Sequence, residues 1–157
     1  MIFGIDPGTE ESGIAFVDMN YSILKAAKMA NEDVISLIST ERETIDIIII
    51  ESLHCYGQRI IGQETFETAY FIGEIRRKAK DYGISFCLFS KPEYARAICG
   101  VMKVTDAVLW QALKLRFGGD KKGEPLNILK GNSDKKHAYA LCVYYIDLQQ
   151  LRKRIKK

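Results

Sequence analysis

Short apolar runs separated by turn residues dominate the first half of the chain and predict β-strands. We expect strands at residues 2–6, 12–18 and 22–28, and the short turns between them make these strands antiparallel neighbours. A β-branched run at 44–51 is apolar at consecutive positions, which is typical of a central strand covered on both faces. A fifth strand is expected at 84–89.

Helical patterns occupy most of the remaining chain, with Asn, Ser or Thr at several predicted starts. We expect helices at 31–41, 62–81, 92–97, 106–117 and 133–154. The order of elements predicts an α/β fold with a central five-stranded mixed sheet, three antiparallel strands followed by two parallel ones, and helices on both faces. No repeat or linker interrupts the pattern, so residues 1–157 are expected to form a single domain.

The helix expected at 62–81 is apolar on two opposite sides. One side carries Phe66, Ala69, Tyr70 and Gly73. The other side carries Phe71, Ile72, Ile75 and Ala79. A helix of this kind requires burial on both sides. One side can cover the sheet and the other a second copy of the chain in a two-fold dimer. The alternative is a helix enclosed within a single core.

Composition and charge narrow the class of protein only modestly. Apolar residues make up 47% of the chain and charged residues 27%, which are the values of a globular protein. A net charge of +3 does not establish a polyanionic partner, but the basic end at 151–157 can track phosphates. The alternative for that end is a solvated helix terminus that complements the helix dipole.

The sequence carries no signal for secretion, membrane insertion or zinc binding. No run approaches the roughly 20 apolar residues of a membrane span, and no basic segment followed by an apolar one stands at the N-terminus. The four cysteines form no CxxC pair and only two histidines occur, so a zinc site is not expected. These features predict a soluble, cytoplasmic protein with no membrane partner.

Four side chains that can bind metal fall where a folded sheet would gather them. Asp6 ends the first strand before a Pro-Gly turn, and Glu51 ends the fourth strand. Asp134 and His137 stand three residues apart at the start of the last helix and share one helical face. If the first and fourth strands are neighbours, the last helix needs only to pack across their ends. Clustered carboxylates require a cation, and oxygen ligands favour Mg²⁺ or Mn²⁺.

Each of these residues also has a purely structural interpretation. Asp6 can shape the turn that follows it, and Glu51 can be a solvated strand end. Asp134 can cap its helix, and His137 can be an interior histidine with satisfied hydrogen bonds. The joint order of the four residues along one α/β pattern favours the functional interpretation.

These motifs resemble those of RuvC-like Holliday-junction resolvases of the ribonuclease H-like superfamily, in the small form of phages and Gram-positive hosts. Residues 4–9 and 12–13 resemble the first motif of that family, and residues 48–51 resemble its second acid. Residues 134–140 resemble its last motif, and residues 65–73 resemble the helix at its dimer interface. The resemblance extends over nearly the whole chain.

The resemblance implies a ribonuclease H-like, RuvC-like nuclease domain and a crossover junction endodeoxyribonuclease. Such a homodimer would cut a four-way DNA junction by paired symmetric nicks, leaving 5′-phosphate and 3′-hydroxyl ends. Two Mg²⁺ or Mn²⁺ ions would bind in each active site. The residues that would bind these ions and act in catalysis are Asp6, Glu51, Asp134 and His137. A phage-encoded member would act in the host cytoplasm, and the sequence does not reveal a helicase partner.

The residues expected to contact DNA are basic or aromatic, and at one of these positions the chain differs from the family. The expected contacts are His54, Tyr56, Lys91, Arg96, Lys103, Lys135 and Lys136. Bacterial members usually carry Phe three residues after the second acid, where this chain has His54. A histidine can stack on a base, and Tyr56 can take the same part.

Alternative functions stay open at this point. A related ribonuclease H-like nuclease would cut RNA or branched DNA more broadly. A non-catalytic junction-binding module would bind without cutting. An actin-like ATP-binding domain has a similar first motif, but it needs a second lobe for which this chain has no room.

Overall fold

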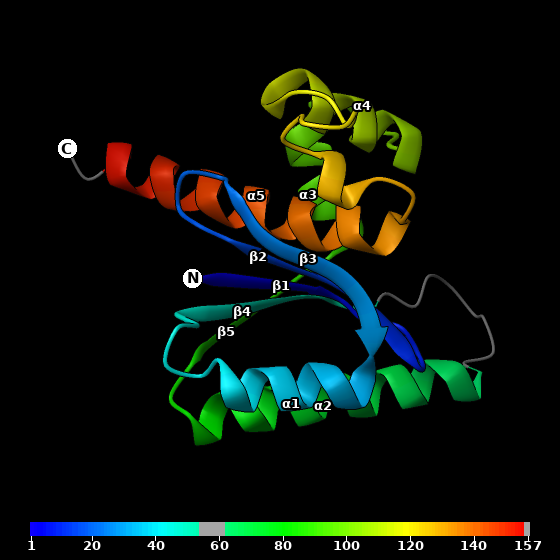
Figure 1. Ribbon diagram of the computed structural model, residues 1–157, viewed down its shortest axis with the longest axis vertical. Helices are drawn as coiled ribbons and strands as arrows, with labels where there is room; N and C mark the ends of the chain where they lie inside the picture. The colour runs from blue at the N-terminus through cyan, green and yellow to red at the C-terminus, as the bar shows by residue number, and fades with distance from the viewer. Residues whose placement is uncertain (54–61, 156–157) are drawn as a thin grey trace.

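A mixed five-stranded sheet forms the centre of the computed structural model, which describes residues 1–53 and 62–155 (Figure 1). Its strands are β1 (Ile2–Asp6), β2 (Glu11–Val17), β3 (Ile23–Ala30), β4 (Ile47–Glu51) and β5 (Ser85–Phe89). They stand in the order β3-β2-β1-β4-β5. The pairs β1–β2 and β2–β3 are antiparallel, whereas β1–β4 and β4–β5 are parallel. The predicted mixed sheet is confirmed.

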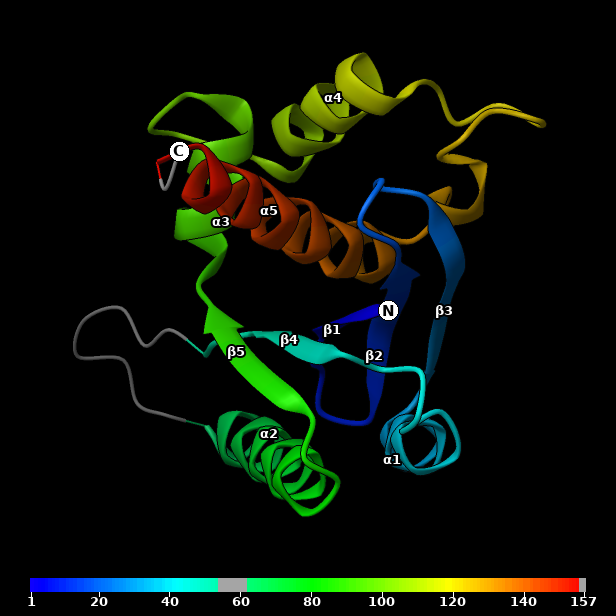
Figure 2. The same ribbon diagram turned by 90° about the vertical axis from the view of Figure 1, so that its left-hand side faces the viewer.

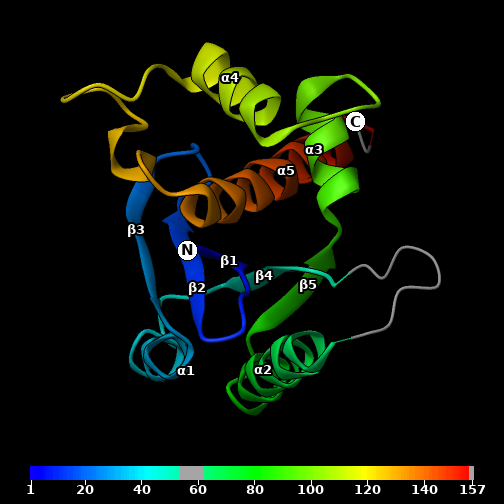
Figure 3. The ribbon, with the colours of Figure 1, turned by 90° about the vertical axis from the view of Figure 1, so that its right-hand side faces the viewer.

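Helices cover both faces of this sheet (Figures 2 and 3). They are α1 (Asn31–Thr40), α2 (Gln63–Asp81), α3 (Lys91–Cys99), α4 (Asp106–Phe117) and α5 (Ser133–Ile155). Helices α1 and α2 lie on one face, and α5 crosses the other face with α3 and α4 packed outside it. None of the helices in residues 1–53 and 62–155 has both the length and the apolar composition of a membrane span.

Most elements begin and end within two residues of the expected positions, and two differences are larger. Strand β4 begins at Ile47 and not at residue 44, because the Thr44 N–H donates to the Glu41 carbonyl and closes a turn there. A single 3₁₀ turn, η1 (Asn127–Leu129), precedes α5 in a stretch for which no element was predicted.

Alternate residues of β1 and β4 build two separate cores. Phe3 and Ile5 pack on the α1–α2 side together with Ile48 and Ile50 of β4. The residues between them pack on the α5 side, as Ile49 does. Since side chains alternate along a strand, the last residues of β1 and β4 also face α5. This alternation places both strand-borne acids on the side from which the last helix approaches.

Helix α2 is buried on only one of its two apolar sides. Phe71 and Ile75 pack against the sheet, whereas the side chains of Phe66 and Tyr70 are 51% and 75% exposed. Ala69 and Gly73, predicted for the same dimer face, are exposed as well. In the described chain, α2 is therefore not enclosed within a single core, and one of its apolar sides is exposed.

Helix α5 rests directly on the backbone of β1 and β2 at two glycines. A Cβ atom added to Gly4 would overlap the Ala138 carbonyl oxygen and lie 2.6 Å from Cys142 Sγ. A Cβ added to Gly13 would overlap the backbone of Asp134. Only glycine permits this close approach, which brings the first turns of α5 onto the ends of the strands.

We predict that Gly4→Ala lowers the free energy of unfolding by about 1–3 kcal/mol or more, because α5 must move away from the sheet. The matched control is Gly73→Ala, since no described residue lies within 4 Å of a Cβ added there. Because Gly73 lies on the side of α2 predicted to dimerise, both variants are measured on dilute, monomeric protein. This change in an exposed helix interior should raise stability by about 0.5–1 kcal/mol. Urea denaturation followed by circular dichroism measures both. Equal stability of Gly4→Ala and the unaltered chain would contradict the close approach.

Candidate active site

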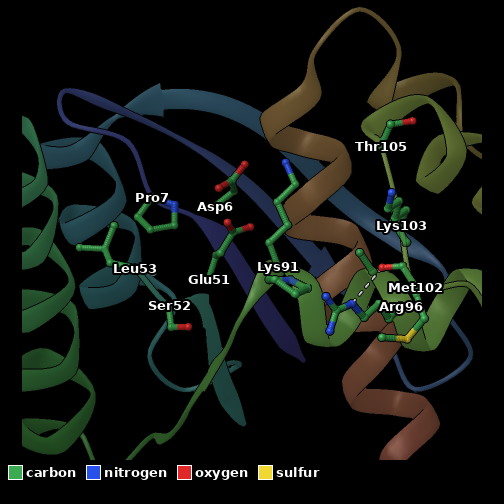
Figure 4. Close-up of a pocket in the computed structure, with 13 residues that line it drawn as sticks. Asp6, Pro7, Glu51, Ser52, Leu53, Lys91, Arg96, Met102, Lys103 and Thr105 are labelled. Carbon is green, nitrogen blue, oxygen red and sulfur yellow. Dashed lines mark hydrogen bonds between the residues drawn. The ribbon is translucent and has the colours of Figure 1, made fainter. Parts of the chain in front are cut away.

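The carboxylates of Asp6 and Glu51 lie side by side at the ends of neighbouring strands. Ile5 of β1 pairs with Ile50 of β4, so the two acids are the next residues on parallel strands. Both line a cavity of about 610 Å³ at this edge of the sheet. Figure 4 shows the two carboxylates and the Lys91 amino group directed toward the same space.

Basic side chains form the far wall of this cavity. Lys91 begins α3, Arg96 lies farther along the same helix, and Lys103 lies in the segment before α4. The Arg96 Nε–H donates to the Met102 carbonyl oxygen at 3.1 Å, which fixes that segment against α3. All three residues were predicted to contact DNA, and the structure brings them to the cavity that Asp6 and Glu51 line.

The turn after β1 is held by residues other than Asp6. The Gly8 N–H donates to Ser12 Oγ at 3.3 Å, and the Ser12 hydroxyl donates to Asn31 Oδ1 at 2.7 Å. The Asn31 amide in turn donates to the Gly8 and Thr9 carbonyls at 3.0 Å. This network makes Asp6 unnecessary for the turn and leaves its carboxylate free for chemistry.

Asp134 does not cap α5, because Asn132 does. The Lys135 N–H donates to Asn132 Oδ1 at 3.0 Å, the geometry of an N-cap. The Asp134 carboxylate instead pairs with Lys28 Nζ on β3 at 3.2 Å. It shares a second cavity, of about 420 Å³, with Asp6 and Lys28. Asp6 therefore lies between Glu51 on one side and Asp134 on the other.

This crowding changes the acidity of Asp6. Burial raises its pKa to about 8, and the negative charges of Glu51 and Asp134 act in the same direction, while Lys91 opposes them. A divalent cation would relieve this repulsion. The donor set of three carboxylates and one imidazole suits Mg²⁺ or Mn²⁺, so the residues present fit such an ion chemically.

His137 is buried and joined to Glu51 through a tyrosine. Its Nδ1 lies 2.7 Å from the Tyr94 hydroxyl, which donates to Glu51 Oε2 at 2.6 Å. Its Nε2 lies 3.3 Å from Asp106 Oδ1. Burial lowers the pKa of His137, and the nearby Lys91 charge lowers it further. The imidazole therefore favours its neutral form, which a metal ligand requires.

Within residues 1–53 and 62–155, no three His, Cys, Asp or Glu side chains converge closely enough to hold a metal ion as they stand. The four predicted ligands form a chain of neighbours. Asp6 shares one cavity with Glu51 and another with Asp134, and Tyr94 joins Glu51 to His137. For these side chains to reach a common ion, Asp134 would have to leave Lys28, and the exposed Asp106 would have to move away from Nε2 of His137.

Three residues of this site were not predicted from the sequence: Lys28, Tyr94 and Asp106. Thr105 caps α4 by accepting from the Val108 N–H, so the adjacent acid Asp106 is free to bind Lys91 at 2.9 Å. This contact lowers the pKa of Asp106. In the sequence, an acid in the first turn of a helix indicates only a favourable dipole contact. No local sequence pattern marks Tyr94 as a residue of the site.

Comparison with solved structures identifies the fold. Two structures of RuvC from Thermus thermophilus, one of them in complex with a Holliday junction substrate, match with TM-scores of 0.66 and 0.67. Their sequence identities to this chain are 13% and 14%. The match covers 94% of this chain and 95% and 96% of the two RuvC chains. This chain has the RuvC fold. No protein-family model and no curated protein sequence matches the chain.

Lys135 and Lys136 were also predicted to contact DNA, but neither lines the cavity beside Asp6 and Glu51. The Lys135 amino group donates to the Ile128 carbonyl at 2.5 Å, and Lys136 Nζ lies 4.4 Å from the centre of the Trp110 ring. Both amines are therefore engaged by protein groups. His54 and Tyr56 lie outside the described residues.

The raised pKa of Asp6 predicts a pH-dependent stability. Asp6 binds its proton more tightly in the folded state, with a pKa of about 8, than at the ordinary value of 3.8. The contribution of Asp6 to folding stability is therefore largest below pH 3.8, and it is lost as the pH rises to about 8. In chelator, Asp6→Asn should lack this decline and exceed the unaltered protein by on the order of 3 kcal/mol above that pH.

Urea denaturation across this pH range measures the effect. Asp81→Asn is the control, because Asp81 lies at the exposed end of α2 and pairs only with Arg77 among the described residues. Parallel stability curves for Asp6→Asn and the unaltered protein would show that Asp6 is not crowded.

Proposed function

We propose that this chain is a metal-dependent DNA endonuclease that resolves four-way junctions. The observation that carries the proposal is the position of Asp6, which is buried between two other acids and opposite Lys91. Burial, together with the charges of Glu51 and Asp134, raises the pKa of Asp6 to about 8, and a divalent cation would stabilise its charged form. The RuvC fold supports the choice of reaction, since one RuvC of this fold is solved with a Holliday junction substrate.

Substrate binding follows from the charges around the cavity. Lys91, Arg96 and Lys103 would contact phosphates on either side of the bond to be cut. Asp6 and Glu51, at the floor between them, exclude a phosphate unless a cation intervenes. The basic wall therefore positions the backbone, and the acids make its binding at the floor dependent on metal.

Catalysis would use the four predicted ligands: Asp6, Glu51, Asp134 and His137. Two ions are expected, Mg²⁺ or Mn²⁺. The chemistry that such ions supply when bound is the activation of an attacking water and the neutralisation of charge on the leaving oxygen. The protein holds Asp6 and Glu51 on rigid strand ends, while Asp134 and His137 approach from α5. Hydrolysis would leave 5′-phosphate and 3′-hydroxyl ends.

The exposed apolar side of α2 supports a homodimer. Phe66 and Tyr70 present large apolar surfaces on this side, next to Ala69 and Gly73. A two-fold pair joined there would carry two equivalent active sites. Two such sites would cut two strands of one four-way junction symmetrically.

A cruciform plasmid assay tests this function. Paired nicks within one binding event convert the supercoiled plasmid to linear DNA, whereas independent single nicks give open circles. A four-way junction, a flap and an RNA–DNA hybrid, offered at equal concentration with Mg²⁺ or Mn²⁺, separate a junction resolvase from a broader nuclease. Tight junction binding without any metal-dependent cut would instead identify a binding module.

We predict that Asp6→Asn and Glu51→Gln each lower the cleavage rate by at least about 1,000-fold, because each removes a ligand worth several kcal/mol of charge stabilisation. Junction affinity, measured by fluorescence anisotropy in chelator, should stay the same or rise, since negative charge is removed. Asp81→Asn should cleave at the unaltered rate. Continued cleavage by Asp6→Asn would reject the assigned site.

A further inference from the structure

A continuous line of contacts runs from Glu51 through Tyr94 and His137 to Asp106. The Tyr94 side chain is completely buried, and His137 is 4% exposed. The Tyr94 hydroxyl lies 2.6 Å from Glu51 Oε2 and 2.7 Å from His137 Nδ1. The last contact, from His137 Nε2 to Asp106 Oδ1, is longer at 3.3 Å.

The hydrogens available in the contacts from Glu51 through Tyr94 to His137 determine which ring nitrogen of His137 carries a hydrogen. A contact of 2.6 Å between two oxygens requires a hydrogen between them. With Glu51 as a carboxylate, this hydrogen belongs to the Tyr94 hydroxyl, which has only one. The second short contact then takes its hydrogen from the ring, so Nδ1–H of His137 donates to the Tyr94 oxygen. A neutral imidazole carrying hydrogen on Nδ1 has a free lone pair on Nε2.

The alternative is the other tautomer of His137, which carries its hydrogen on Nε2. There the Tyr94 hydroxyl donates to Nδ1, and Nε2–H donates to Asp106. The 2.6 Å contact would then need a protonated Glu51, and the hydrogen bond gained at Asp106 would be the longest of the three. Lys91 already satisfies the same Asp106 oxygen at 2.9 Å. The first arrangement leaves Nε2 and Asp106 Oδ1 as two acceptors 3.3 Å apart, a repulsion that the Lys91 charge on the same oxygen offsets. Because it retains both short hydrogen bonds, the first arrangement is favoured.

We infer that Tyr94 is a positioning residue that holds His137 with its hydrogen on Nδ1 and so keeps Nε2 free for a divalent metal. This inference rests on the proposed function, in which His137 is a metal ligand. Metal-binding histidines generally donate their other ring N–H to a fixed acceptor, which orients the ring and sets the tautomer. Here the acceptor is the Tyr94 hydroxyl, which also holds Glu51 in place.

Ring-nitrogen NMR of the metal-free protein tests the tautomer directly. The chain has only two histidines, so two imidazoles contribute, and a His54→Gln sample assigns them. At about pH 8, where an ordinary histidine is neutral, His137 should show its hydrogen on Nδ1. A hydrogen on Nε2 in the unaltered protein would overturn the inference without any variant having to fold.

Tyr94→Phe tests the role of the hydroxyl while it preserves the ring. The variant should lose the preference for Nδ1–H and bind Mn²⁺ alone about 10- to 100-fold more weakly in calorimetry. Tyr139→Phe is the matched control, because that buried hydroxyl donates to the Tyr21 carbonyl at 3.1 Å. It should leave the tautomer and the Mn²⁺ affinity unchanged.

These measurements separate this inference from the proposed function, because neither of them involves DNA. An unchanged tautomer and unchanged Mn²⁺ affinity in Tyr94→Phe would overturn the role of Tyr94, whatever the nuclease activity. The expected tautomer and affinity loss in a protein that cuts no junction would reject the nuclease and retain the metal-binding role.

Discussion

The contact between α5 and the backbone of β1 and β2 is the constraint on which the site depends. Gly4 and Gly13 remove the side chains that would otherwise hold the helix away from the sheet. The close approach places Asp134 directly over β2, and it places His137 where the Tyr94 hydroxyl joins it to Glu51 at the end of β4. Without it, the two strand-borne acids would face a cavity with no residue of α5 in reach.

This packing concentrates negative charge that the metal-free protein has to balance. Lys28 pairs with Asp134, and Lys91 pairs with Asp106 and lowers the pKa of Asp6 against the effects of burial and neighbouring acids. The lysines thus act as internal counter-ions for the acids. Coordination of a divalent ion by Asp134 would replace its contact with Lys28, so metal binding would release this lysine.

Much of the fold was predictable because local patterns and tertiary packing agree. The consecutive isoleucines at 47–50 occupy the buried β4, and the acids at positions 6 and 51 lie next to each other as expected. What could not be predicted was contact between elements distant in sequence. Tyr94 reaches Glu51 and His137 across 43 residues in each direction, and no local pattern marks such a residue.

The same limit applies to the arrangement of the predicted ligands. A helical spacing places Asp134 and His137 on one face, but the rotamer of each depends on which partner is nearest. Lys28 comes from β3 and Asp106 from α4, and both compete with the site for these side chains. The sequence therefore marks the four candidate ligands, whereas their partners in the metal-free state, Lys28, Tyr94 and Asp106, could not be predicted from it.

The most direct measurement is anomalous diffraction from crystals of the protein grown with Mn²⁺. The account predicts anomalous peaks in the cavity beside Asp6 and Glu51. The carboxylate of Asp134, released from Lys28, or Nε2 of His137, released from Asp106, should lie within about 2.5 Å of an ion. Peaks that contact neither residue of α5, or no peak at Asp6, would contradict a site shared between the strand ends and the last helix.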